Sequence, residues 1–279
     1  MPSKERILIG GAPGVGKTFA WATIARACPK NRFYVIDPDD GVRRVLSEVD
    51  SDGNRIFPDL SNIEYYFTPK WYTDGVASVP KVKKIDSKEM LCSYSGIADA
   101  WKTIEPKIKP DDWIVVEHLG NIWGRAQDGF ADEVFDKDIG QYFLEKRKLM
   151  KAGAKRIDAL EGWTDWSVIN KLHNDDFMIP VCFENQAHVF MTTAVTMTEP
   201  RAKEDTEIKA FYGDSSIRFE GQKHNPFRAQ TILLFKASGS KDTRKYVMNT
   251  FLKDRGRPWI QESEWSDFYL EYLCIVAGW

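Results

Sequence analysis

Residues 11–18 read Gly11-Ala-Pro-Gly-Val-Gly-Lys-Thr18, and this stretch decides the fold. It fits the pattern GxxxxGK[ST], follows the apolar run "RILIG" at 6–10, and precedes residues with helical spacing that stop at Pro29. A strand that ends in glycines lets successive backbone N–H groups converge on a phosphate, and a helix N-terminus favours the bound anion. We therefore predict a phosphate-binding loop between a buried strand and a helix.

The lysine and the hydroxyl of this pattern have defined chemical roles. The lysine reaches the β- and γ-phosphates and the hydroxyl ligates Mg²⁺, so these roles are assigned to Lys17 and Thr18. ATP and Mg²⁺ are the expected ligands. The alternative, a glycine turn that holds no nucleotide, is uncommon where a strand and a helix flank the motif. The residues expected to bind the nucleotide are Gly11, Ala12, Pro13, Gly14, Val15, Gly16, Lys17, Thr18 and Phe19.

Acidic residues follow two further predicted strands. The strand at 32–36 ends in a run of acids at 37–40, where Asp39 or Asp40 can polarise an attacking water. The strand at 113–116 ends in Glu117, which fits the Walker B arrangement that supports Mg²⁺. The alternative for Glu117 is an ordinary acid at a strand end. His118 is expected to pack or to form hydrogen bonds and not to act as a base.

Three more strands complete the predicted core. The run at 188–196 ends in hydroxyl residues, so Thr192 or Thr193 can sense a γ-phosphate, although β-branched threonines also simply suit a strand. The runs at 231–235 and 245–252, separated by a turn rich in Gly and Ser, predict a C-terminal hairpin. We expect an α/β fold with a mainly parallel central sheet flanked by helices.

Composition excludes several classes of protein. The chain has 279 residues, 43% of them hydrophobic, and a formal net charge of −2, so an overall attraction to nucleic acid is not expected. The sequence contains no apolar run of about 20 residues, which predicts a soluble, cytoplasmic protein without a membrane partner. Cys28, Cys92, Cys182 and Cys274 form no CxxC pair and predict idle thiols and not a metal site.

In the order of these motifs the chain resembles the RecA-like P-loop ATPases, which include RecA and RadA recombinases, KaiC and DnaB-type helicases. The resemblance implies a RecA-like P-loop NTPase core in which Glu117 supports the metal and Asp39 orients water. Glu117 stands where the family usually has Asp, and Asp39 stands where the recombinases have Glu. The stretch "LKDRGRPW" at 252–259 matches the family's last motif. By this resemblance Lys253 and Arg255 reach the nucleotide of a neighbouring subunit, whereas Arg257 has no assigned role.

More narrowly, the chain is similar to phage-encoded RecA-like ATPases of the AAA_24 type, through "WIVVEHLGNIW", "GWTDWSVIN" and "LKDRGRPW". This similarity implies a homo-oligomer with nucleotide at the subunit interfaces, single-stranded DNA as partner, and the host cytoplasm as location. The leading functional hypothesis is an ATPase that acts on DNA in recombination, annealing or replication. The alternatives are a nucleotide-gated assembly or scaffold protein with weak hydrolysis, and a small-molecule kinase.

We expect one domain, residues 1–279, with insertions at about 50–94, 127–166 and 199–230. The first contains aromatics beside lysines, which fits either a stacking surface for single strands or a solvated insertion. The second is charged and helical, and is either a phosphate-contacting face or a solvated one. Trp163, Trp166 and Ile169 have helical spacing and predict core packing. In the third, the resemblance implies DNA binding, with phosphate contacts from Arg201, Lys203, Lys209, Arg218, Lys223 and Arg228.

Overall fold

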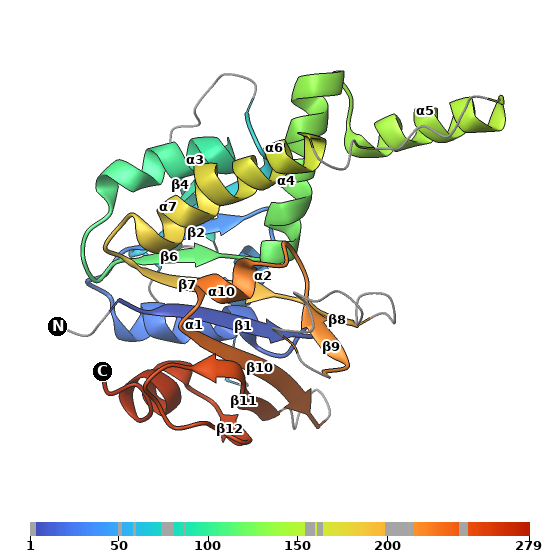
Figure 1. Ribbon diagram of the computed structural model, residues 1–279. Helices are drawn as coiled ribbons and strands as arrows, with labels where there is room; N and C mark the ends of the chain where they lie inside the picture. Colours follow the sequence, from blue (N-terminus) through green and yellow to red (C-terminus); the bar gives the residue numbers. More distant parts are fainter. Residues whose placement is uncertain are drawn as a thin grey trace.

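A ten-stranded sheet forms the centre of the protein, with the strand order β12-β11-β10-β1-β7-β6-β2-β3-β5-β4 (Figure 1). The computed structural model describes residues 4–49, 52–57, 60–73, 81–85, 88–153, 160, 164–198, 212, 215–239 and 245–279. The strands are β1 Arg6–Gly11, β2 Phe33–Asp37, β3 Ile63–Lys70, β4 Lys81–Ile85, β5 Lys88–Gly96, β6 Trp113–Val116, β7 His188–Thr193, β10 Thr231–Ser238, β11 Lys245–Asp254 and β12 Ser263–Trp265. A second, two-stranded sheet pairs β8 Val195–Met197 with β9 Ile217–Phe219.

Most neighbouring strands of the main sheet are parallel. Strand β1 pairs in parallel with both β7 and β10, and β6 lies between β7 and β2. Antiparallel pairs occur at the two edges, where β11 joins β10 and β12, and β4 joins β5. The expected mainly parallel α/β sheet with a C-terminal hairpin is confirmed, and β12 extends that hairpin by one strand.

Helices cover both faces of the sheet. One face carries α3 Ile97–Ile104, α4 Leu119–Phe135, α6 Thr164–His173 and α7 Ile179–Phe183, and the other carries α1 Lys17–Ala27, α2 Val42–Leu46 and the π-helix η4 Tyr269–Cys274. The remaining elements are α5 Ile139–Lys151, α10 Asn225–Arg228, the 3-10 turn η1 Glu105–Lys107 and the π-helix η2 Asn174–Met178. Figure 1 shows α5 extending away from the sheet, and none of its residues is buried.

Each central strand divides its side chains between two cores. Leu8 of β1 packs with the helices of one face, whereas Ile7 and Ile9 pack with those of the other. This division follows from the two-residue period of a strand, and it explains why a central strand covered on both faces is a continuous apolar run. The run "ILI" in β1 is fully buried for this reason.

The segment 50–94, expected to be an insertion, contributes to the sheet itself. Strands β3 and β5 pair in parallel next to β2, and β4 closes that edge. Their sequences mix aromatic and charged residues, so the uninterrupted apolar pattern of a fully covered strand is missing. The described part of the second expected insertion is largely helical, because it contains the second half of α4, all of α5 and the first residues of α6.

Strand β7 ends earlier than the run at 188–196 predicts. It stops at Thr193, and the chain passes through Ala194 into β8, which pairs with β9 and not with the main sheet. In the part of the chain that the structure describes, no helix combines the length and the apolar character that crossing a bilayer requires.

Candidate nucleotide site

The loop after β1 has the backbone geometry that its glycines allow. Gly14 and Gly16 have φ values of 76° and 91°, in the left-handed region that side chains other than glycine disfavour. Gly16 is the N-cap of α1, which begins at Lys17. The loop therefore connects a buried strand directly to a helix N-terminus, as the sequence predicts.

Lys17 lies inside the loop and is held by its carbonyls. Its Nζ donates to the backbone oxygens of Gly11 at 2.8 Å and Ala12 at 2.9 Å. Burial lowers the pKa of Lys17, and the carboxylates of Glu117 and Glu220 oppose that shift. The ammonium group is thus placed at the loop, beside acids that stabilise its charge.

Glu117 follows β6 and contacts α1 directly. Its Oε1 accepts from the Thr18 hydroxyl at 2.8 Å, and its Oε2 accepts from the Trp21 indole at 3.0 Å. Burial raises the pKa of Glu117, while these hydrogen bonds and the Lys17 charge act in the opposite direction. The two residues expected to support Mg²⁺, Thr18 and Glu117, are therefore side by side.

The three acids around the end of β2 have different environments. Asp37 is buried, and it accepts from the backbone N–H groups of Asp39, Asp40 and Val42, so it caps the start of α2. Asp40 forms an ion pair with Arg43. Asp39 lines the cavity at the loop, whereas Asp40 is not among its lining residues, and this placement distinguishes the two acids.

Asp39 is also tied to the helix that follows Glu117. Its Oδ2 accepts from Asn121 Nδ2 at 2.9 Å, and Asn121 belongs to the first turn of α4. The sequence did not single out Asn121, because an amide in a helix has no distinctive pattern. It connects the acid of β2 with the segment after β6.

The candidate hydroxyls and His118 have separate neighbours. Thr192 is fully buried, and its hydroxyl is one of the groups that lower the pKa of Glu117. The Thr193 hydroxyl donates to the Glu220 carbonyl at 2.9 Å. His118 caps α4 by accepting from Gly120 N at 3.2 Å, and burial lowers its pKa. The expectation of a hydrogen-bonding role for His118 agrees with this geometry.

The loop and the acids enclose one cavity of about 320 Å³. It lies at the C-terminal ends of the parallel strands, where ligands bind in open α/β sheets. Its lining residues are Pro13, Gly14, Gly16, Lys17, Thr18, Phe19, Asp39, Gly41, Val45, Glu48, Glu117, His118, Ala194 and Tyr246.

An aromatic group on one side of this cavity was not predicted. Tyr246 of β11 stacks on Trp265 of β12 with ring centroids 5.2 Å apart, and Phe19 lies 5.9 Å from Tyr246. A Cβ on Gly16 would meet both Tyr246, at 3.0 Å, and Trp265, at 3.2 Å. The C-terminal hairpin therefore packs directly on the phosphate loop, a contact between segments 230 residues apart that no local pattern indicates.

Lys253 and Arg255 lie towards the end of the strands opposite the phosphate loop. Strand β11 runs antiparallel to β10, so Lys253 pairs with Ile232 at the start of β10, whereas the loop adjoins Phe235. That difference of three residues in register is about 10 Å along the strands. Arg255 is exposed, while Lys253 Nζ donates to the Phe227 carbonyl at 3.3 Å. Burial lowers the pKa of Lys253 to about 8.

Arg257, unassigned from the sequence, has a structural contact. It forms a largely buried ion pair with Glu5, which precedes β1, and its Nη1 donates to the Tyr272 hydroxyl at 3.3 Å. This contact ties the turn after β11 to the start of β1 and to η4. The three cations of the last motif thus have three different environments.

Part of the expected DNA-binding segment is described. Arg201, Lys203 and Lys209 lie outside the described residues. Arg228, expected at phosphates, is buried and donates to Asn174 Oδ1 at 2.5 Å, so its guanidinium is used inside the protein. Arg218 is partly buried in β9, and Lys223 is exposed.

Many solved structures are similar to this chain, and they include a recombinase and a KaiC-like protein. No protein-family model and no curated protein matches the sequence. The crystal structure of the RadB recombinase is similar with a TM-score of 0.48 and 10% identity, over 94% of this chain and 87% of that one. A KaiC-like protein from the hyperthermophilic archaeon Pyrococcus horikoshii OT3 is similar with a TM-score of 0.44 and 13% identity, over 95% and 86%.

Proposed function

We propose that this protein is a RecA-like ATPase that binds and hydrolyses ATP and acts on single-stranded DNA in recombination, annealing or replication. The observation that supports the proposal is that the phosphate loop, Glu117 and Asp39 meet at one cavity. Each of these groups follows a different parallel strand, and each has the chemistry that one part of phosphoryl transfer requires. A phage-encoded, oligomeric protein of the host cytoplasm is the corresponding biological setting.

The residues present fit a nucleotide with its metal. Lys17 is placed to hold the β- and γ-phosphates. Its ammonium group donates to two backbone carbonyls of the loop, and phosphate oxygens can take the place of these carbonyls as acceptors. The Thr18 hydroxyl and the Glu117 carboxylate offer adjacent oxygens, the ligand type that Mg²⁺ prefers. Mg²⁺ bound there would neutralise charge on the phosphate oxygens.

Asp39 is the proposed water-orienting acid. It lines the cavity, and Asn121 holds one of its oxygens, so the carboxylate has a fixed direction. Asp37 and Asp40 are engaged by the backbone of 39–42 and by Arg43 respectively. Asp39→Asn should therefore slow hydrolysis and leave nucleotide binding in place.

The exposed position of Arg255 supports action on a neighbouring subunit. It follows β11 at the end of the strands opposite the loop of its own chain, a position that favours action on a nucleotide held by another copy. Such a cation can contribute about 10³ to 10⁵ in rate. Hydrolysis per protomer should then rise with protein concentration.

The deciding experiment measures ATP turnover against protein concentration, with and without single-stranded DNA. We expect turnover to rise with both, and to be lost in Lys17→Ala and Arg255→Ala. Lys236→Ala is the control, because Lys236 is an exposed lysine that pairs with Glu262 away from the cavity. A turnover that ignores DNA, together with no strand binding or annealing, would refute the DNA-directed function.

A second candidate is a nucleotide-gated assembly protein with weak hydrolysis. The buried state of Glu117 favours it, since burial raises the pKa of this acid and two donors already occupy its oxygens. Size measurements with and without ATP, combined with turnover counts, separate the two. Assembly on ATP with negligible turnover would support the scaffold function.

A further inference from the structure

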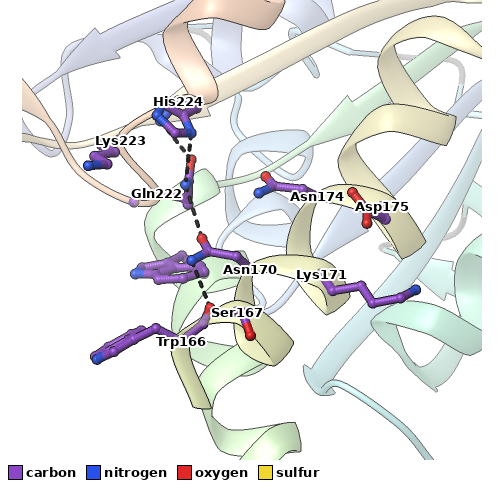
Figure 2. A pocket seen from close by; sticks show the side chains of 11 residues that line it. Trp166, Ser167, Asn170, Lys171, Asn174, Asp175, Gln222, Lys223 and His224 are labelled. Carbon is purple, nitrogen blue, oxygen red and sulfur yellow. Dashed lines mark hydrogen bonds between the residues drawn. The ribbon is translucent and has the colours of Figure 1, made fainter. Parts of the chain in front are cut away.

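A second cavity, of about 720 Å³, lies beside α6 and is separate from the phosphate loop. Figure 2 shows residues of α6 and η2 on one side of it and Gln222, Lys223 and His224 on the other. Its volume is within the range of small-molecule sites, about 300–1,000 Å³. We call it the indole–amide pocket. Its lining residues are Trp123, Trp166, Ser167, Asn170, Lys171, Asn174, Asp175, Gly221, Gln222, Lys223 and His224.

Two tryptophans give this pocket a flat aromatic wall. The rings of Trp123, from α4, and Trp166, from α6, stack with centroids 6.2 Å apart and an interplanar angle of 23°. Both side chains are only partly buried. Both indoles pack against the hydrophobic core, as the helical spacing of Trp166 predicted. Their exposed parts line the cavity and are surfaces on which a planar group can stack.

A row of polar groups lies next to the indoles. Gln222 Nε2 donates to Asn170 Oδ1 at 3.1 Å, and Asn170 Nδ2 donates to the Trp166 carbonyl at 2.7 Å (Figure 2). Gln222 Oε1 accepts from His224 N at 2.6 Å. These bonds fix the direction of each amide. Gln222 is buried and bonds to Asn170 and His224, so it holds Asn170 in place, and the partly buried Asn170 is the amide that can meet the edge of a nucleobase.

Lysines and acids both lie at the pocket. Lys223 is exposed on the segment after β9, and Lys171 is an exposed lysine on α6 that pairs with Asp176 at 3.3 Å. Asp175 also lines the pocket, so the two lysines are matched by two acids, and stacking rather than net charge carries the proposed contact. Aromatic side chains beside lysines are a combination that binds the nucleotides of a single strand.

We propose that the indole–amide pocket binds one unstacked nucleobase of single-stranded DNA. This rests on the DNA-directed function proposed above and adds to it the place where a base is held. Both the strand and a free nucleotide carry this chemistry, and competition by a free mononucleotide distinguishes them.

The pocket shares that segment with the nucleotide site. Glu220 N donates to the Ala194 carbonyl at 3.0 Å, and Ala194 lines the phosphate-loop cavity. Two residues later, Gln222 lines the indole–amide pocket. On the other side, α4 starts just after Glu117 and carries Trp123. A base held in this pocket would lie against α4, which begins just after Glu117, and against the segment that bonds to Ala194, so DNA binding there can influence hydrolysis.

The test compares two fluorescent strands of equal length by fluorescence anisotropy at fixed salt. One is an oligothymidylate of about 12 nucleotides. The other has the same backbone with abasic sites in place of the thymidines, so the phosphate charges are the same. The unmodified protein should bind the abasic strand roughly 5- to 100-fold more weakly. Because this comparison needs no variant, it does not depend on how any substitution affects folding.

Variants then locate the base. Trp166→Ala should lower affinity for oligothymidylate to that for the abasic strand, whereas Trp166→Phe keeps a ring and should retain most of it. Phe183→Ala is the control, because Phe183 is also a half-exposed aromatic residue, on α7 over Arg6. Competition by thymidine monophosphate shows whether the pocket binds a base of a DNA strand or a free nucleotide.

The outcomes are distinct. Equal binding of the two strands by the unmodified protein overturns the pocket and leaves the DNA-directed function intact. Loss of affinity in Phe183→Ala as large as in Trp166→Ala also overturns the pocket. Competition by the free mononucleotide at the concentration of the strand overturns the assignment to DNA. If the unmodified protein binds neither strand, the DNA-directed function and the pocket both fail.

Discussion

The Thr18 hydroxyl donates to Oε1 of Glu117 at 2.8 Å, and this bond joins the first turn of α1 to the end of β6. The phosphate loop and the acidic strand are separated by β7 in the sheet, so only side chains bring them together. The side chain of Glu117 also reaches Trp21. The extra methylene of Glu relative to Asp is therefore used to reach α1.

Glu117→Gln should stop hydrolysis without removing nucleotide binding. The amide has the same shape but lacks the negative charge that supports Mg²⁺, so we expect turnover to fall at least ~10-fold, about 1.4 kcal/mol of activation free energy. Phosphate release and binding of a fluorescent ATP analogue measure the two effects separately. Glu48→Gln is the matched control, because Glu48 is exposed in the same cavity. An unchanged turnover in Glu117→Gln would show that the Glu117 charge takes no part in hydrolysis.

Gly16→Ala should destabilise the protein and weaken nucleotide binding. At φ 91° an alanine costs about 1–2 kcal/mol, and its Cβ would also press on Tyr246 and Trp265. Gly124→Ala is the matched control, since Gly124 lies within α4 and a Cβ there meets nothing within 4 Å. That change should instead stabilise the protein by about 0.5–1 kcal/mol. Urea unfolding measures both, and equal effects would contradict the geometry of the loop.

Local patterns predicted the loop, its flanking elements and the two acids, because glycine positions and apolar runs act over a few residues. They did not predict Tyr246 at the loop, since that contact depends on how β11 and β12 pack. The spacing of Trp166 predicted its packing on the core, but not the cavity that its exposed part lines, because Gln222 and Trp123 approach it from other segments. Arg228 resembled a phosphate ligand, but Asn174 accepts its hydrogen bond inside the protein. Such contacts between distant segments carry no local signal.

Arg257→Met should destabilise the protein by about 3–5 kcal/mol, because it leaves Glu5, only 2% exposed, without its charged partner and with the Trp279 indole as a remaining donor. The double variant Glu5→Gln with Arg257→Met removes both charges and should recover much of that loss. Urea unfolding of the wild type, both single variants and the double variant gives the coupling energy. Strictly additive losses would mean that the two side chains do not interact. ATP turnover per folded protomer should be retained, which distinguishes Arg257 from Arg255.

His173 should make the protein less stable in mild acid. Its ring is fully buried, its Nε2 lies 2.9 Å from Asn225 Oδ1, and burial lowers its pKa from 6.5 to about 4. As the pH falls, the unfolded chain therefore binds the proton before the folded protein does. The contribution of the neutral His173 to the free energy of unfolding is fully present above pH 6.5 and is lost as the pH falls from 6.5 towards 4. The shift corresponds to about 3 kcal/mol. Urea unfolding at several pH values should show a weaker decline in His173→Gln than in the wild type. Parallel pH profiles would contradict the buried, uncharged state of this imidazole.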